Sequence, residues 1–412
     1  MDLQKIQLTN FRNYPKLELE FSPHVNVLIG ENAQGKTNLL EAIYVLALAR
    51  SHRTTNDKEM IAFEEEFAKI SGTIQRRLGK SKLDLILNKK GKKALVNQLE
   101  KARLSQYLGQ LNVILFAPED LALVKGAPTL RRRFIDMEFG QIDSQYLASL
   151  SQYRQVLKQK NQYLKMLRQK QAQDELYLDV LSDQLAIYGS QVIFKRQQFL
   201  QILEKHAQKT QSEISQAKEE LKLVYDCSLK EFSEMTASEL TVENLQKALK
   251  AEYQKLKNYE IKRGTTLVGP HRDDMRILLN DKNVQIYGSQ GQQRTAALAL
   301  KLAEIDVMYE KTGEYPILLL DDVLSELDSQ RQTLLLKTIQ GKVQTFLTTP
   351  QLTDVAQNLI EEPRIFAIEQ GQVTLQQEGF MKTTELELQE NKKKVEKEQE
   401  LNEILGIVPK KE

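Results

Sequence analysis

The sequence predicts an α/β fold: a core built around a glycine-rich loop, an antiparallel β subdomain, and an inserted arm of short helices. Three observations predict it. A glycine-bounded loop at residues 30–37 joins an apolar run to a helical pattern, and a second apolar run, 317–320, ends in two aspartates. Between them, residues 143–260 contain almost no glycine or proline. Strand and helix patterns on both sides of this helical block indicate one α/β domain that the block interrupts.

Composition excludes several classes of protein. The 412 residues are 41% hydrophobic and 28% charged, which is enough for a large core, and the formal net charge is +2. So small a charge does not indicate a nucleic-acid binder, and any DNA surface has to be a local patch. The single cysteine, Cys227, excludes a disulfide framework and a cysteine-based zinc site. With no apolar leader and no run of about 18 apolar residues, we expect a soluble, cytoplasmic protein.

The loop at residues 30–37 carries the complete pattern Gly-x-x-x-x-Gly-Lys-Thr of a P-loop. A mostly apolar run, 25–29, precedes it, and apolar residues recur at helical spacing from 38 to 48. Backbone N–H groups at such a helix N-terminus bind phosphate. Lys36 would reach the β- and γ-phosphates, and Thr37 would offer its hydroxyl to Mg²⁺. We therefore assign nucleotide binding to Gly30, Glu31, Asn32, Ala33, Gln34, Gly35, Lys36 and Thr37.

The first 29 residues indicate three strands that lead into this loop. The turn between the first two reads Asn10-Phe11-Arg12-Asn13-Tyr14, with one cation and two aromatic side chains. It is either an ordinary hairpin corner or a segment that places Arg12 or Asn13 beside the nucleotide.

Residues 67–103 indicate an antiparallel β region with a turn at 89–93 and a strongly basic surface. From residue 76 to residue 103 there are ten Lys and Arg against one Asp and one Glu. The lysines either protect an exposed strand edge from aggregation or bind the phosphates of DNA. On the second interpretation the contacts come from Arg76, Arg77, Lys89, Lys90, Lys92 and Lys93.

Residues 111–136 contain a buried run, 111–116, and a triplet of arginines, 131–133. The triplet is either one face of a helix or a second anion site.

The chain is predicted to have four parts. Residues 143–260 form the arm: Leu178, Leu181 and Leu185 belong to a heptad seam, and the helices are too short for a long coiled-coil rod. The arm splits the nucleotide domain into residues 1–142 and 261–378. Residues 379–412, rich in Lys and Glu, form a charged extension.

The apolar run 317–320 ends in Asp321 and Asp322, the pattern of a Walker B strand. The buried strand would place Asp321 at its carboxyl end, facing the P-loop, where it would hold Mg²⁺. Asp322 follows on the other side of the strand end, where it would polarise the attacking water as the catalytic residue.

A second anion-binding helix start is predicted at Ser289-Gln290-Gly291-Gln292-Gln293. A chain with one P-loop holds no second nucleotide for it. The economical interpretation is that Ser289, Gly291, Gln292 and Gln293 bind the γ-phosphate held by another copy of the chain. Ser325-Glu326-Leu327-Asp328 would lie at the same junction.

This order of motifs resembles the ABC-type ATPase heads, and its details resemble the RecF family of bacterial DNA repair proteins over residues 1–375. The quoted motifs carry the resemblance, together with Gly269-Pro270-His271-Arg272-Asp273-Asp274 and Leu320-Asp321-Asp322-Val323. It implies an SMC-like head without the rod, and an ATP-gated homodimer with Mg²⁺. It also implies binding to double-stranded DNA and its junctions with single strands, in gap repair, replication and SOS induction. RecR and RecO would be partners in loading recombinase.

Three departures from other ABC proteins fit this family, and two of them, the shorter acid and the missing His, indicate slow hydrolysis. The signature is Ser-Gln-Gly-Gln-Gln, the acid after Walker B is Asp322 and not Glu, and the switch position holds Thr348 or Thr349 and not His. The alternative function is the soluble ATPase subunit of a membrane transporter. The signature variant and the arm argue against it. A related nuclease would need a further acidic domain, for which the chain has no room.

Overall fold

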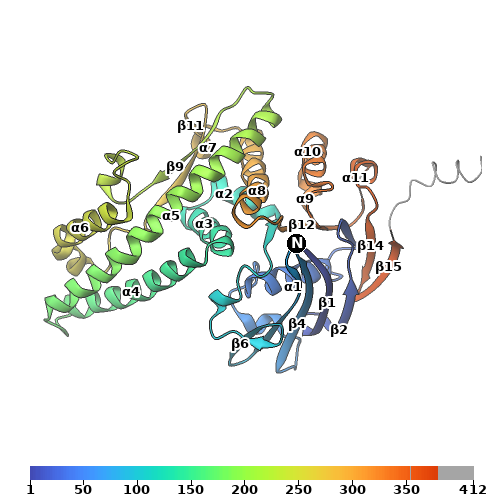
Figure 1. The fold of residues 1–412 in the computed structure, drawn as a ribbon, viewed down its shortest axis with the longest axis horizontal. Coiled ribbons are helices and arrows are strands. Elements are labelled where there is room, and N and C mark those ends of the chain that lie inside the picture. The colour runs from blue at the N-terminus through green and yellow to red at the C-terminus, as the bar shows by residue number, and fades with distance from the viewer. Residues whose placement is uncertain (353, 379–412) are drawn as a thin grey trace, which may run out of the picture.

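The computed structural model describes residues 1–352 and 354–378. The predicted charged extension, 379–412, lies outside the described residues. The described chain forms a strand-rich part and a helical part that meet at an angle (Figure 1).

One six-stranded sheet carries the P-loop. Its order is β15 (Gln372–Glu378), β14 (Arg364–Glu369), β3 (Val25–Ile29), β13 (Thr345–Thr349), β12 (Ile317–Asp321) and β8 (Val113–Phe116). All neighbouring pairs are parallel except β14 and β15. Because parallel strands end at the same edge, the ends of β3, β12 and β13 lie together: Thr349 pairs with Ile29, and Asp321 with Thr348.

The second six-stranded sheet is antiparallel, in the order β2 (Tyr14–Glu20), β1 (Asp2–Phe11), β4 (Phe67–Arg76), β5 (Gly79–Asn88), β6 (Gly91–Val96) and β7 (Leu99–Glu100). Helix α1 (Lys36–Leu48) packs against strands of both sheets, and 11 of its 13 residues are buried. A helix that is apolar on all sides requires such cover on all sides. The predicted turn at 89–93 is shorter than expected, because β6 begins at Gly91 and pairs Lys92 and Lys93 with β5.

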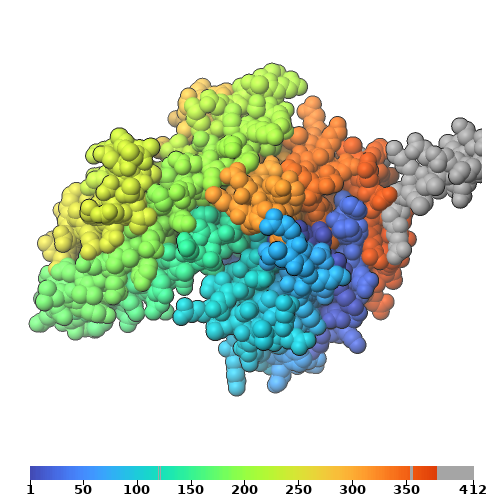
Figure 2. All heavy atoms as spheres, viewed as in Figure 1, coloured from blue at the N-terminus to red at the C-terminus, as the bar shows by residue number. Residues whose placement is uncertain are grey.

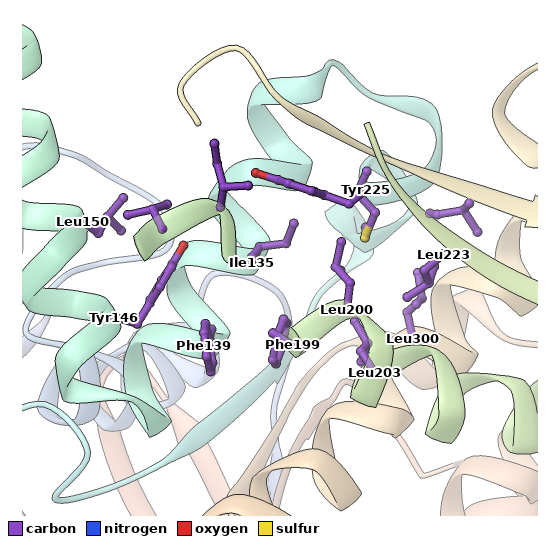
Figure 3. Close-up of a cluster of buried hydrophobic side chains, with 14 of the residues drawn as sticks. Ile135, Phe139, Tyr146, Leu150, Phe199, Leu200, Leu203, Leu223, Tyr225 and Leu300 are labelled. Carbon is purple, nitrogen blue, oxygen red and sulfur yellow. The ribbon is translucent and has the colours of Figure 1, made fainter. Parts of the chain in front are cut away.

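The helical part contains α3 (Pro128–Ile142), α4 (Ser144–Arg168), α5 (Glu175–Ser215) and α6 (Val242–Arg263). A three-stranded sheet lies with them: β11 (Lys282–Asn283), β10 (Asp274–Leu279) and β9 (Leu221–Asp226). Figure 3 shows their shared core, in which Phe139 stacks on Phe199 beside Ile135 and Leu200. Strand β9 was not predicted inside the arm, although Leu221, Leu223 and Tyr225 alternate as buried residues.

Helix α8 (Gln290–Thr312) joins the two parts. Ala299 and Leu300 belong to the helical core, whereas Leu302 and Ile305 pack in the core beside the P-loop sheet. The remaining helices are short: α2 (Leu121–Lys125), α7 (Val284–Tyr287), α9 (Val323–Glu326), α10 (Ser329–Ile339) and α11 (Asp354–Leu359). None of the described helices is long and apolar enough to cross a bilayer. The division at residues 142, 260 and 378 stays a prediction.

Candidate nucleotide site

The P-loop connects β3 to α1, and two of its positions require glycine. A Cβ at Gly30 would lie 2.3 Å from the carbonyl oxygen of Ile368 in the neighbouring strand β14. Gly35 has φ +121°, and a Cβ there would lie 2.7 Å from Asn13 Nδ2 and 2.8 Å from the Tyr14 hydroxyl. The loop therefore runs so close to β14 and to the β1–β2 turn that no side chain fits between them.

Lys36 and Thr37, the last two residues of the P-loop pattern, make different contacts. Lys36 Nζ donates hydrogen bonds to the carbonyl oxygens of Gly30 and, at 2.8 Å, Glu31. Thr37 Oγ1 donates to Asp321 Oδ1 at 3.0 Å, and Thr348 Oγ1 donates to the same oxygen at 2.8 Å. The sheet thus brings together residues from three segments that lie up to 311 positions apart, from Thr37 to Thr348.

These side chains line an open pocket of about 370 Å³. Its described lining consists of Asn32, Ala33, Gly35, Lys36, Thr37, Asn38, Arg53, Asp321, Asp322 and Thr348. Arg53 and Asn38 were not assigned to the site from the sequence. Arg53 Nη1 donates to Asn38 Oδ1 at 2.7 Å, and the only sequence signal was a cation shortly after the predicted helix.

Asp322 is held in an unusual environment. Its backbone is left-handed, with φ 52°, and its N–H donates to Thr348 Oγ1 at 3.0 Å. Its Oδ1 is buried and accepts no hydrogen bond from any described residue. Burial raises the pKa of the Asp322 carboxyl, and the charges of Asp321 and Glu326 add to this, against Ser325 and Lys36. Burial lowers the pKa of Lys36.

The residues present fit a triphosphate and one Mg²⁺. The glycines leave a cradle that a Cβ would fill, and Asp322 Oδ1 is a buried acceptor without a donor. Within residues 1–352 and 354–378, no group of three or more His, Cys, Asp or Glu side chains is placed to hold a metal. Mg²⁺ would therefore take Thr37 and Asp321 as protein ligands and complete its shell with phosphate and water oxygens.

The side chains of the turn at residues 10–14 contact the P-loop and helix α1. The Tyr14 hydroxyl donates to the carbonyl of Gly35 at 3.0 Å, and Asn13 Oδ1 accepts from Asn38 at 2.8 Å. Arg12 reaches the fully buried Glu41 of α1, with Nε 3.0 Å from one carboxylate oxygen and Nη2 2.8 Å from the other. Asn13 therefore lies beside the P-loop, whereas Arg12 clamps the helix that follows it.

The predicted second anion site lies at the start of α8. Ser289 caps the helix. Its Oγ accepts a hydrogen bond from the N–H of Gln292 at 3.2 Å, and Oε1 of Gln292 accepts one from the N–H of Ser289 at 2.9 Å. Gln293 is buried and donates to the Val284 carbonyl at 3.1 Å. A Cβ at Gly291 would make only ordinary van der Waals contacts, 3.7 Å from Arg331 Nη2 and 3.9 Å from Ser289 Oγ. None of residues 288–294 lines the P-loop pocket.

Arg331 of α10 connects this helix start to the segment after Walker B. Its Nη2 donates to the carbonyl of Gly291 at 3.1 Å and to Thr295 Oγ1 at 2.7 Å, and its guanidinium also pairs with Asp328. No sequence pattern indicated this arginine, because its partners other than Asp328 are 36 or more positions away.

The basic residues predicted to face DNA are divided by the structure. Arg76 pairs with Glu314 at 3.0 Å, and Lys92 pairs with Asp57 at 2.9 Å while donating to the Ala49 carbonyl. The other four side chains, those of Arg77, Lys89, Lys90 and Lys93, are exposed, and Lys93 pairs with Glu100 at 3.5 Å.

The arginine triplet serves three different purposes. Arg131 is buried and makes a bidentate pair with Asp274, at 2.7 and 2.8 Å. Arg132 donates to the carbonyl of Asp273 at 2.7 Å. Arg133 is half-buried and lines two pockets. Two arginines of the triplet, Arg131 and Arg132, therefore make packing contacts, and the third, Arg133, lines a pocket.

Comparisons with known proteins follow this geometry. The family model described as RecF/RecN/SMC N terminal domain matches residues 2–374. The DNA replication and repair protein RecF of Ligilactobacillus salivarius is 64% identical over 374 residues, covering 91% of this chain and 97% of that protein. The protein of the same name from Enterococcus faecalis is 51% identical over 373 residues, covering 90% and 98%.

Solved structures agree with the sequence matches. "Structure of the recombination mediator protein RecF-ATPrS in RecFOR pathway" has a TM-score of 0.84 at 35% identity and covers 91% of this chain and 98% of that one. An SMC head bound to a winged-helix domain of ScpA has a TM-score of 0.53 at 14% identity, covering 93% and 99%, which is a likeness of fold alone. These matches confirm the predicted fold class of an ABC-type, SMC-like head.

Proposed function

Because the chain belongs to the RecF family of DNA replication and repair proteins, as its motifs indicated, we propose that it is an ATP-gated DNA-binding protein of recombinational repair. Two copies would join when ATP is bound, grip double-stranded DNA or its junction with a single strand, and separate after hydrolysis. The solved relatives whose titles name ATP and the RecFOR pathway support this nucleotide and this pathway. On the same ground, RecR and RecO would be partners in loading recombinase.

One observation carries the proposal: the P-loop pocket contains everything for a triphosphate except the signature segment. Lys36, Thr37, Asp321 and Asp322 line it, but no residue of 288–294 does. That segment instead starts a capped helix, in which a Cβ at Gly291 would make only van der Waals contacts. An anion-binding helix start that lies outside the P-loop pocket supports a site completed by a second copy of the chain.

Each residue of the pocket has a definite role in this proposal. ATP supplies the phosphoanhydride bond, and Mg²⁺ neutralises its phosphate oxygens. Lys36 exchanges its bonds to two loop carbonyls for bonds to phosphate. Thr37 and Asp321 hold Mg²⁺, and Thr348 fixes the carboxylate of Asp321 in place. Asp322 orients the attacking water through Oδ1, the buried oxygen that accepts no bond within the described chain.

Slow hydrolysis follows from the same residues. The carboxylate of Asp322 is one methylene shorter than that of Glu, and its raised pKa makes the ionised form harder to maintain. Thr348 replaces a switch histidine with a hydroxyl that is already bonded to Asp321. A slow ATPase suits a protein whose hydrolysis ends a DNA-bound state.

The protein would contact the phosphates of DNA and not the base edges. Arg77, Lys89, Lys90 and Lys93 are exposed near two turns of the antiparallel sheet, and contacts of this kind fix position without reading sequence. Arg76, Lys92 and Lys93 are engaged in ion pairs and would contribute less than Arg77, Lys89 and Lys90.

The test compares oligomeric state in matched variants by light scattering with ATP and Mg²⁺. Asp322→Asn should bind ATP and accumulate dimers. Gly291→Glu fits the single chain, because a Cβ there makes only van der Waals contact, 3.7 Å from Arg331 Nη2, but it places a negative charge where the partner's phosphate would lie. We expect it to bind ATP and stay monomeric, whereas the control Gly291→Ala dimerises. Monomeric Asp322→Asn, or dimeric Gly291→Glu, would contradict the shared site.

A further inference from the structure

A second pocket, of about 410 Å³, lies between the helical part and the strand-rich part. Its walls come from the end of α1, from α3, α4 and α5, and from Pro270 and His271. In Figure 2 the green and teal residues lie beside the cyan and blue part. The pocket shares no lining residue with the P-loop pocket, so it is a separate site.

Five arginines line this pocket against a single carboxylate. The arginines are Arg50, Arg132, Arg133, Arg154 and Arg196, and the carboxylate is that of Asp136. His271 adds no charge at neutral pH, because burial lowers its pKa to about 4. The lining therefore carries an excess of four positive charges.

The one carboxylate is fully engaged. Asp136 accepts from Arg196 at 2.8 Å, from Arg154 at 2.7 Å, and from the Tyr146 hydroxyl. Arg50 and Arg133 make no ion pair with any carboxylate in residues 1–352 or 354–378. Burial lowers the pKa of Arg50, and the positive charges of Arg133 and Arg154 lower it further.

Two of the cations, Arg196 and Arg132, are held in place by hydrogen bonds. Arg196 is 2% exposed and donates to the carbonyl of Pro270 at 2.7 Å. Arg132 is anchored by bonds to the Asp273 carbonyl and to Thr129 Oγ1. Arg154 is 61% exposed at the mouth. Arg50 and Arg133 lie near each other without a carboxylate partner among the described residues, which is unfavourable, and an anion would relieve it.

The chemistry of the lining selects the anion. Guanidinium groups bind phosphate through two parallel N–H bonds, and several arginines around one pocket favour a group with more than one charged oxygen. A pocket of this size admits a phosphate with a sugar attached. Apolar side chains of the lining could cover that sugar; they are Leu48, Leu108, Met137, Leu147, Leu150 and Leu157.

We propose that the pocket between α1, α3 and α4 is a phosphate-binding site, in which Arg50 and Arg133 are the free ligands and Arg132 and Arg154 complete the shell. The phosphate comes either from the DNA backbone or from a free nucleotide. The site goes beyond the function proposed for the P-loop and does not require that function to be right.

The first arm of the test uses pyrophosphate and the Lys36→Ala background, which disables the P-loop. Isothermal titration should detect pyrophosphate binding to this protein. Adding Arg50→Ala and Arg133→Ala should weaken that binding at least tenfold. The matched control removes two exposed cations elsewhere, Arg276→Ala and Lys247→Ala, and should leave the affinity unchanged.

The second arm measures the affinity of a 30-base-pair duplex against salt concentration. If DNA supplies the phosphate, the pocket variant should make the negative slope of log K against log salt shallower by about 1 to 2 relative to the control pair. If a free nucleotide supplies it, the slope stays unchanged while pyrophosphate binding is lost. Unchanged pyrophosphate binding together with an unchanged slope would overturn the proposal.

A charge-conserving variant separates binding from folding. Arg50→Lys with Arg133→Lys keeps both charges and loses only the two-pronged geometry, so pyrophosphate should bind more weakly than to wild type but more tightly than to the alanine pair. If the alanine pair fails to fold, the lysine pair decides: affinity equal to that of Lys36→Ala alone would overturn the assignment.

Discussion

Replacing Glu41 with Gln tests how the helix behind the P-loop is held. Glu41 is fully buried, and its carboxylate receives Arg12 Nε at 3.0 Å, Arg12 Nη2 at 2.8 Å and the Ser51 hydroxyl. Arg53 Nη1 lies 3.3 Å away. Glutamine has nearly the same shape, but it offers one acceptor oxygen and turns an NH₂ group toward cationic donors.

The expected loss of stability follows from these contacts. A hydrogen bond to a charged group contributes about 1.5–3 kcal/mol, and breaking a buried ion pair from one side costs about 3–5 kcal/mol. Arg12 is 18% exposed and can regain some water, and Gln keeps one acceptor, so the lower end applies. We expect Glu41→Gln to lower the free energy of unfolding by about 2–3 kcal/mol at pH 7.5.

The pH dependence identifies the cause. Burial raises the pKa of Glu41, but the hydrogen bonds of Arg12 and Ser51 and the charges of Arg12 and Arg53 outweigh it, so the net shift is downward. Stabilisation by a carboxyl with a lowered pKa is present above its unfolded pKa and disappears as pH falls through the folded value. The difference between wild type and Glu41→Gln should therefore be constant from pH 7.5 to 5 and shrink below about 4.3.

Urea denaturation at several pH values measures this difference, with the exposed Glu66→Gln as control. The control should change the midpoint little at any pH. A Glu41→Gln protein as stable as wild type at pH 7.5, or one whose deficit persists unchanged below the unfolded pKa, would refute the role of the ion pair.

Three further predictions concern the pocket and the DNA surface. Gly30→Ala should abolish ATP binding measured by titration, because the backbone of Ile368 is in the way; normal affinity would show that the loop can move. The kcat/KM for ATP should fall on the acid side with a pKa above the ordinary value for Asp, since burial raises the pKa of Asp322; an acid limb near pH 4 would contradict this. Replacing the cluster Lys89, Lys90, Lys92 and Lys93 with Ala should flatten the salt dependence of duplex binding measured by anisotropy; an unchanged slope would place the DNA surface elsewhere.

Much of the fold could be predicted because its signals are local. The strand 25–29 was predicted with the bounds of β3, and the helix after the P-loop was predicted to within two residues at its start. Apolar runs that end in glycine or aspartate are readable without tertiary information. The parallel sheet then brings Thr37 and Asp321 together, as the Walker motifs require.

The features that could not be predicted from the sequence depend on partners far apart in the chain. Strand β9 is stabilised by β10, about 50 residues later, so its short alternation was hidden in a helical context. The sequence left open whether Arg131 belonged to a helix face or to an anion site, and its bidentate pair with Asp274 decides for the helix face. The pocket around Arg50 and Arg133 is lined by segments from both parts of the molecule, and no spacing of residues in the sequence predicts it.

The most direct test of the shared nucleotide site mixes two inactive variants. Lys36→Ala has no working P-loop, and Gly291→Glu has no working signature segment, so each alone should hydrolyse almost no ATP. In a mixed dimer, the P-loop of the Gly291→Glu chain faces the intact signature of the Lys36→Ala chain. The proposal predicts ATPase activity in the mixture well above the sum of the two separate proteins. Activity equal to that sum would contradict a site built from two copies of the chain.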